Sequence, residues 1–160
     1  MKLNRADLDN HIDEERGNYS DLLEAVSKGK ISDIDTMYEH GNDIFALSED
    51  DTSKNTLLHI AVQTINIKAT EFLIKKGINV NTKNANNETP LHHAVAIKNE
   101  NKAVEIIDMM LIKGADPHIK DKLGDTPIEK AKRLGKSEIL LLFADRDESR
   151  VGTPSVAYRL

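Results

Sequence analysis

Apolar positions along the chain recur in short clusters whose spacing fits helices rather than strands. Residues 67–74 and 106–111 carry apolar side chains at helical intervals. Each cluster is followed within a few residues by Gly77 or Gly114, and glycine commonly ends a helix in left-handed backbone. A shorter apolar segment precedes each cluster and starts at a threonine, a good N-cap. The pattern predicts a mostly α protein built from helix pairs, each with a short helix followed by a longer one.

A six-residue motif repeats along the chain. It reads TLLHIA at 56–61, TPLHHA at 89–94 and TPIEKA at 126–131, and a degenerate copy, LLEA, lies at 22–25. The threonines are 33 and then 37 residues apart. A proline after the threonine suits the first position of a helix, where no backbone N–H is needed. Four copies at nearly constant spacing indicate a repeat architecture.

This motif and its period resemble the ankyrin repeat, from Ser20 to Ala144. The resemblance implies an ankyrin-repeat solenoid of stacked helix-turn-helix pairs with short β-hairpin fingers. We expect a polar N-terminal extension over 1–18, a repeat domain over 19–145 and a flexible C-terminal tail over 146–160. The expected repeats span about 20–52, 53–85, 86–122 and 123–145.

The first and last copies differ from the inner two in having polar residues within the motif. Glu24 stands in the first copy, and Lys130 and Lys132 flank the alanine of the last. An end repeat lacks one neighbour, so one of its faces must be polar. We therefore expect the first and last copies to be capping repeats.

Two places depart from the period. The first finger, between Gly41 and Thr56, is longer than the others and acidic, with Asp43 and residues 49–51. The third copy has four extra residues near 98–102, which we expect in the turn between its helices. Such insertions occur near binding surfaces, and they also arise by drift in tolerant loops.

The composition of the chain narrows the classes of function that it can have. The 160-residue chain has a net charge of −5, 4% aromatic residues, no Trp and no Cys. These values disfavour nucleic-acid binding and exclude disulfides and thiol nucleophiles. The longest apolar run, 139–144, is too short to span a membrane. No catalytic motif occurs. We expect no enzyme activity and no cofactor, and a monomer located in the cytoplasm.

The histidines of the motif admit a structural and a metal-binding interpretation. The resemblance implies that His59 and His92 bond backbone groups of the adjacent finger. His92 and His93 are neighbours, but on a helix they point about 100° apart, and no further ligand is placed to complete a site. The structural role is favoured. His118 lies in a finger and is expected to be a turn residue.

The resemblance also implies a concave groove for a protein partner, lined by finger tips and short helices. By alignment of the motif, the groove would contain Ser53, Asn55, Gln63, Thr64, Lys83, Asn86, Glu88, Ile97, Lys120, Lys122, Leu123, Asp125 and Arg133. Its four cationic residues predict a partner with an acidic segment, steered by charge. Surface lysines also serve solubility alone. The groove would run from the acidic first finger to this basic half.

Asn81 has a second interpretation. Its spacing from Leu73 and its place after Val80 resemble the ankyrin asparagine that the asparaginyl hydroxylase of animal cells modifies. Asn79 stands where an acidic residue is usual, and a structural finger asparagine is the favoured alternative.

Two functions remain open from the sequence. The first is a non-catalytic protein–protein interaction module. The second is a bacterial effector or regulatory adaptor that targets a host or cellular protein, with the C-terminal tail as a second signal. An effector would act in the host cytoplasm.

Overall fold

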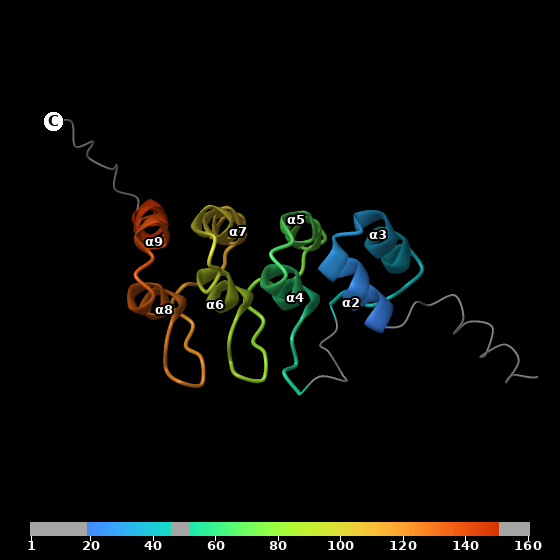
Figure 1. Ribbon diagram of the computed structural model, residues 1–160, viewed down its shortest axis with the longest axis horizontal. Coiled ribbons are helices and arrows are strands. Elements are labelled where there is room, and N and C mark those ends of the chain that lie inside the picture. The colour runs from blue at the N-terminus through green and yellow to red at the C-terminus, as the bar shows by residue number, and fades with distance from the viewer. Residues whose placement is uncertain (1–18, 46–51, 151–160) are drawn as a thin grey trace, which may run out of the picture. The chain divides into compact units, whose positions relative to one another are not determined.

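A computed structural model describes residues 19–45 and 52–150 of the chain (Figure 1). The described residues contain eight helices and no strand, and their fingers are formed by turns. The expected mostly helical fold of paired helices is therefore confirmed. The chain divides between Asn79 and Val80 into two compact units, and each is described by itself. Within the described segments, no helix is long and apolar enough to cross a membrane.

The first unit contains two helix pairs. Its helices are α2 (Tyr19–Lys28), α3 (Ile31–Glu39), α4 (Leu57–Gln63) and α5 (Ile67–Lys75). The short helix α4 packs on α2, while α5 packs on α3. Leu22, Ile34, Leu58 and Leu73 are fully buried between these helices, so the apolar clusters of the sequence form the core.

The second unit repeats this arrangement. Its helices are α6 (Pro90–Val95), α7 (Glu100–Ile112), α8 (Pro127–Arg133) and α9 (Ser137–Arg150). The short helices α6 and α8 pack together in one layer, α7 and α9 in the other, and the fingers extend from the side of the short helices (Figure 1). Leu91, Ile106, Ile107 and Met110 are fully buried.

The motif threonines begin the short helices, as predicted. Thr56, Thr89 and Thr126 are the N-caps of α4, α6 and α8. The residue three positions later reaches back to the backbone N–H of the threonine: His59 at 3.1 Å and Glu129 at 2.8 Å. This reciprocal capping satisfies backbone donors that a helix start leaves open.

The four extra residues of the third copy do not lie in the turn between its helices, so that expectation was wrong. The longer helix begins six residues after the motif alanine both in the second repeat, at Ile67, and in the third, at Glu100. The insertion instead lengthens the helix, since α7 has 13 residues and α5 has 9. Four residues add about one turn, so the apolar face keeps its direction.

The boundary expected for the C-terminal tail also needs correction. Helix α9 continues to Arg150, so residues 146–150 are helical rather than extended. The sequence has no glycine or proline between Lys136 and Val151, and Arg146 forms an ion pair with Asp108 of α7 at 2.5 Å. Residues 151–160 and the extension 1–18 lie outside the described residues.

Left-handed backbone occurs where the repeat alignment predicts it. Gly77 and Gly114 end their helices at φ 91° and 86°. Lys54 and Gly124 occupy matching positions in their fingers, and both have positive φ, 51° and 86°. Lys54 therefore holds a conformation that glycine adopts at lower cost.

Candidate protein-binding surface

The first finger of the second unit is closed by the side chain of Asn84. Its Oδ1 accepts hydrogen bonds from the backbone N–H groups of Asn86 at 2.9 Å and Glu88 at 3.0 Å. The backbone N–H of Asn84 donates to the carbonyl of Glu88 at 2.9 Å. Such turns order a loop without a strand, because the side chain satisfies the backbone donors. Asn84 is itself buried.

The next finger has the same construction, with Asp121 in place of the asparagine. Its Oδ1 accepts from the backbone N–H groups of Leu123 at 2.8 Å and Asp125 at 3.0 Å. The two fingers are joined, since the N–H of Lys122 donates to the carbonyl of Asn86 at 2.9 Å. The tips are thus held in a defined conformation relative to each other.

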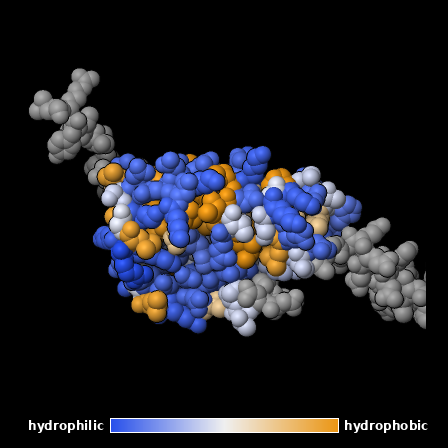
Figure 2. Space-filling model, in the orientation of Figure 1, coloured by the Kyte–Doolittle hydropathy of each residue, from blue (hydrophilic) through white to orange (hydrophobic). Residues whose placement is uncertain are grey.

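Three lysines project from these two fingers. Lys83 and Lys120 directly precede the closing side chains, and Lys122 lies at the tip; all three are exposed. Within the described ranges, none of them forms an ion pair. Beside them, Leu123 is 86% exposed, an unusual position for a large apolar side chain. We call these four residues the finger surface; hydrophilic residues predominate around it (Figure 2).

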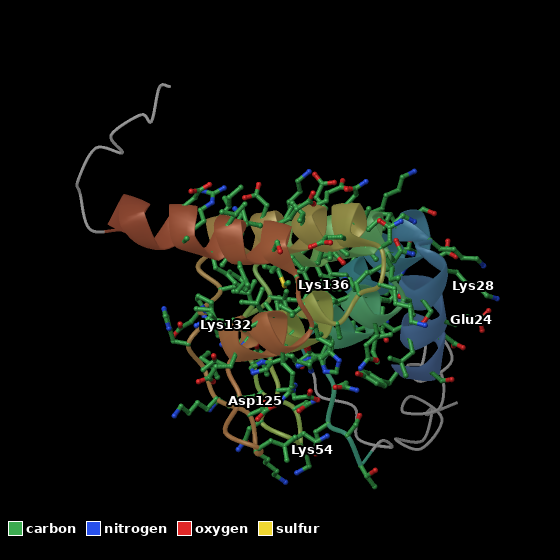
Figure 3. All side chains as sticks on the ribbon, turned by 60° about the vertical axis from the view of Figure 1, so that its left-hand side comes forward. Glu24, Lys28, Lys54, Asp125, Lys132 and Lys136 are labelled. Atoms are coloured by element: carbon green, nitrogen blue, oxygen red, sulfur yellow. The ribbon has the colours of Figure 1, made fainter. Side chains whose placement is uncertain are left out.

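Arg133 does not belong with these lysines as a free cation. Its guanidinium forms an ion pair with the carboxylate of Asp125 at the base of the finger below α8 (Figure 3). The sequence pattern grouped Arg133 with the lysines because it could not show this partner eight residues away. The pair neutralises both charges and leaves the lysines as the exposed cations of the site.

Glu88 lies in a half-buried cluster that sequence reasoning missed. Its carboxylate is 3.1 Å from Nζ of Lys130 and 3.5 Å from Nε2 of His93. Burial raises the pKa of Glu88, but the hydrogen bond from Lys130 and the charge of His93 outweigh it and hold that pKa below its usual value. Glu88 is therefore ionised at pH 7, and its negative charge is paired with the ammonium group of Lys130.

Lys130 was expected on the free face of a capping repeat, and that expectation was wrong. Its side chain is only 17% exposed and points to Glu88 of the preceding finger. A signal existed in the sequence: Ile60, His93 and Lys130 share one motif position, and the change to polar residues there marks the cluster. Lys132 is exposed, and Glu24 is exposed on α2, where Lys28 pairs with it at 2.5 Å (Figure 3).

The motif histidines have structural partners. Nε2 of His92 lies 3.2 Å from the carbonyl of Asp125 in the next finger, as the resemblance implied. Burial lowers the pKa of His92, so its neutral form predominates at pH 7. His59 is fully buried, and its Nδ1 contacts Thr56 at 2.8 Å. The part of the chain that the structure describes contains no group of three or more metal-ligating residues.

Asn81 joins two repeats. Its Nδ2 donates to the carbonyl of Gly114 at 2.9 Å, and its Oδ1 accepts from the N–H of Asp116 at 2.8 Å. Both polar atoms of the amide thus contact the next repeat, which fits a structural finger asparagine. Hydroxylation of Asn81 stays a prediction.

The remaining candidate residues are divided by burial. Asn55 and Ile97 are each only 6% exposed, so neither side chain offers a surface to a partner, and both are removed from the site. In the first unit, Gln63 and Thr64 are exposed and Ser53 is half-buried. Of the acidic first finger, Asp43 is exposed, whereas residues 46–51 lie outside the described ranges. A groove that runs from this finger to the basic half stays a prediction.

Comparison with known proteins agrees with the fold and the repeat. A family model described as ankyrin repeats (3 copies) matches residues 22–107. The chain is 40% identical over 74 residues to a putative ankyrin repeat protein of Escherichia coli, which covers 46% of the chain and 37% of that protein. It is 31% identical over 111 residues to a putative ankyrin repeat protein of Borreliella burgdorferi, which covers 68% of the chain and 25% of that protein.

A third relative is an ADP-ribosylation factor GTPase-activating protein of Arabidopsis thaliana, 33% identical over 93 residues. This match covers 56% of the chain and 12% of that protein. The chain thus matches about a third or less of the length of these relatives.

The paired helices, the turn-closed fingers and the reciprocal caps define a helical repeat protein. The matched model covers more than half of the chain, and the chain belongs to the ankyrin repeat family. Ankyrin repeats generally mediate protein–protein interaction and are typically non-catalytic.

Proposed function

We propose that this chain is a non-catalytic module that binds an acidic or phosphorylated segment of another protein at its finger surface. The observation that carries the proposal is the finger surface itself: Lys83, Lys120 and Lys122 are exposed beside the exposed Leu123 on two joined fingers. Lysine attracts carboxylates and phosphates, and an exposed leucine supplies an apolar anchor for a partner.

The local charge favours this ligand although the whole chain is negative. Two acidic groups of the fingers are paired with cations: Asp125 with Arg133, and Glu88 with Lys130. These two carboxylates are therefore not free to neutralise the three lysines, whereas Asp121 in the finger and Glu129, whose charge interacts with Lys120, remain acidic neighbours. Because the turns are closed by Asn84 and Asp121, little loop entropy is lost on binding.

The test uses a fluorescein-labelled peptide in which Glu residues flank a central Leu, titrated with the full chain and followed by fluorescence anisotropy. We expect binding that weakens as salt rises, mainly through slower association. Replacing Lys83, Lys120 and Lys122 together by Glu should weaken it at least tenfold. Leu123→Ser should weaken it while leaving the salt dependence in place.

The matched control replaces three exposed lysines of the longer helices, Lys68, Lys102 and Lys113, by Glu. Both triple variants change the net charge equally, so only the position of the charge differs. The control should bind like the unmodified chain. If the control loses binding and the finger variant keeps it, the site lies on the longer helices. Lys76 is unsuited to this control because its Nζ is 2.8 Å from Asp35 and lies over the Tyr38 ring.

A further inference from the structure

The outward side of α9 carries an acidic and apolar stripe. Glu138, Leu141 and Asp145 are spaced three and four residues apart, so they share one side of the helix. Leu141 is 65% exposed, and Leu134, at the end of α8, is 48% exposed. We call these four residues the outer stripe. Exposed apolar side chains bordered by polar residues mark interaction sites when they form one patch.

Two of these four positions lie at an interface in the preceding repeat. The repeat offset of 37 residues between Thr89 and Thr126 aligns Leu134 with Ile97 and Asp145 with Asp108. Ile97 is only 6% exposed, and Asp108 pairs with Arg146 of α9. Helix α7 and the turn before it pack on the last repeat through Ile97 and Asp108. The outer stripe has Leu134 and Asp145 at the corresponding positions of the last repeat.

Helix α9 covers this surface of α7, so the residues of α9 that face α7 show which side chains such a surface binds. On α9, Ile139 and Phe143 are 0% and 4% exposed, and Arg146 reaches Asp108 at 2.5 Å. Just before the helix, Nζ of Lys136 donates to the carbonyl of Ile97 at 3.1 Å (Figure 3). Two cations ten residues apart thus flank two apolar residues, which complements a surface of apolar residues and a carboxylate.

Gly135, in the turn between α8 and α9, has open space beside it. Gly135 has φ 67°, and no atom lies within 4 Å of the place where its Cβ would be. Gly29, at the same place after α2, has φ 66° and is in close contact with Asn66, which begins the longer helix of the following repeat. The turn after α8 therefore has the same backbone conformation as the turn after α2, which lies against the start of α5.

We propose that the outer stripe binds a basic amphipathic helix of a partner protein, in the way that α7 binds α9. The partner helix carries two Lys or Arg residues about ten positions apart with two apolar residues between them. Its apolar residues cover Leu134 and Leu141, and one of its cations pairs with Asp145. A second copy of the same stripe is a poor partner, because Glu138 and Asp145 of the two copies would repel each other.

The probe is a fluorescein-labelled peptide of residues 134–150 of this chain in which Glu138, Asp145, Asp147 and Glu148 are replaced by Gln, so that it is basic and keeps the pattern of Lys136, Ile139, Phe143 and Arg146; it is titrated against the full chain. We expect saturable binding that Leu141→Glu weakens at least tenfold. Asp145→Arg should weaken it similarly, and a peptide with Arg146→Asp should restore binding to that variant. The matched control is Ile112→Glu, which changes a residue 59% exposed at the end of α7 and should leave binding intact.

Five results would overturn the proposal. One is the absence of saturable binding, and another is binding that Leu141→Glu leaves unchanged. Binding that depends on Asp108 rather than Asp145 would show that the peptide displaces α9. Binding that appears only after removal of residues 151–160 would assign the stripe to that segment. Sedimentation that shows self-association abolished by Leu141→Glu would assign it to a second copy of the chain.

Discussion

Alanine substitutions at Gly29 and Gly135 allow the energy of one steric contact between repeats to be measured, because the cost of backbone strain is the same at both positions. Both residues follow a short helix at the same repeat position, with φ 66° and 67°. A Cβ at Gly29 would lie 2.7 Å from Oδ1 of Asn66 and closer still to its Nδ2, whereas a Cβ at Gly135 meets nothing within 4 Å. Alanine at each position therefore costs the same backbone strain, and only Gly29→Ala displaces Asn66.

The expected difference follows from what Asn66 does. Its Oδ1 caps α5 by accepting from the N–H of Ala69 at 3.2 Å, and its Nδ2 donates to the carbonyl of Ser27 at 3.4 Å. Loss of an N-cap costs about 1 kcal/mol. Left-handed alanine costs roughly 1–2 kcal/mol in either repeat. We expect Gly135→Ala to destabilise by roughly 1–2 kcal/mol and Gly29→Ala by roughly 2–3 kcal/mol.

Urea unfolding followed by far-ultraviolet circular dichroism measures both free energies of unfolding. The same pair of variants in an Asn66→Ala background isolates the contact, because the difference between Gly29→Ala and Gly135→Ala should then fall close to zero. Equal destabilisation in the unmodified background, within about 0.3 kcal/mol, would refute the argument, since neighbouring groups are expected to couple by more than that.

Three further results are expected from the same unfolding measurement. Ala94→Leu should destabilise by roughly 1–3 kcal/mol or more, because Ala94 is fully buried in α6 and the larger side chain overpacks the helix contact. A neutral result there would contradict the close packing. Lys54→Gly should be neutral or stabilise by up to about 1 kcal/mol, because it relieves left-handed backbone; a clear loss would contradict the finger geometry. Stability should fall between pH 7.5 and pH 5.5: burial lowers the pKa of His92 and His93 below the ordinary 6.5, so the unfolded chain takes up protons that the folded chain does not. Equal or higher stability at pH 5.5 would contradict this sign.

The local framework of this protein follows directly from its sequence. Thr56, Thr89 and Thr126 begin helices, and Gly77 and Gly114 end them, because capping and left-handed backbone depend on residues a few positions apart. The apolar clusters between these signals became the core for the same reason, since helical spacing places them on one side of each helix. The recurrence of the pattern was enough to identify the repeat and its family.

Tertiary structure decided which charges remain available at the surface. From the sequence, Arg133 was expected among the free cations of the groove and Lys130 on the polar face of a capping repeat, but packing brings Asp125 to Arg133 and Glu88 to Lys130. Lys130 and Glu88 are 42 residues apart, and no local rule relates them. Likewise, Ile97 and Leu134 share one repeat position, yet they are 6% and 48% exposed. Burial of a repeat position depends on whether a neighbour packs on it, and only the assembled fold shows where that neighbour lies.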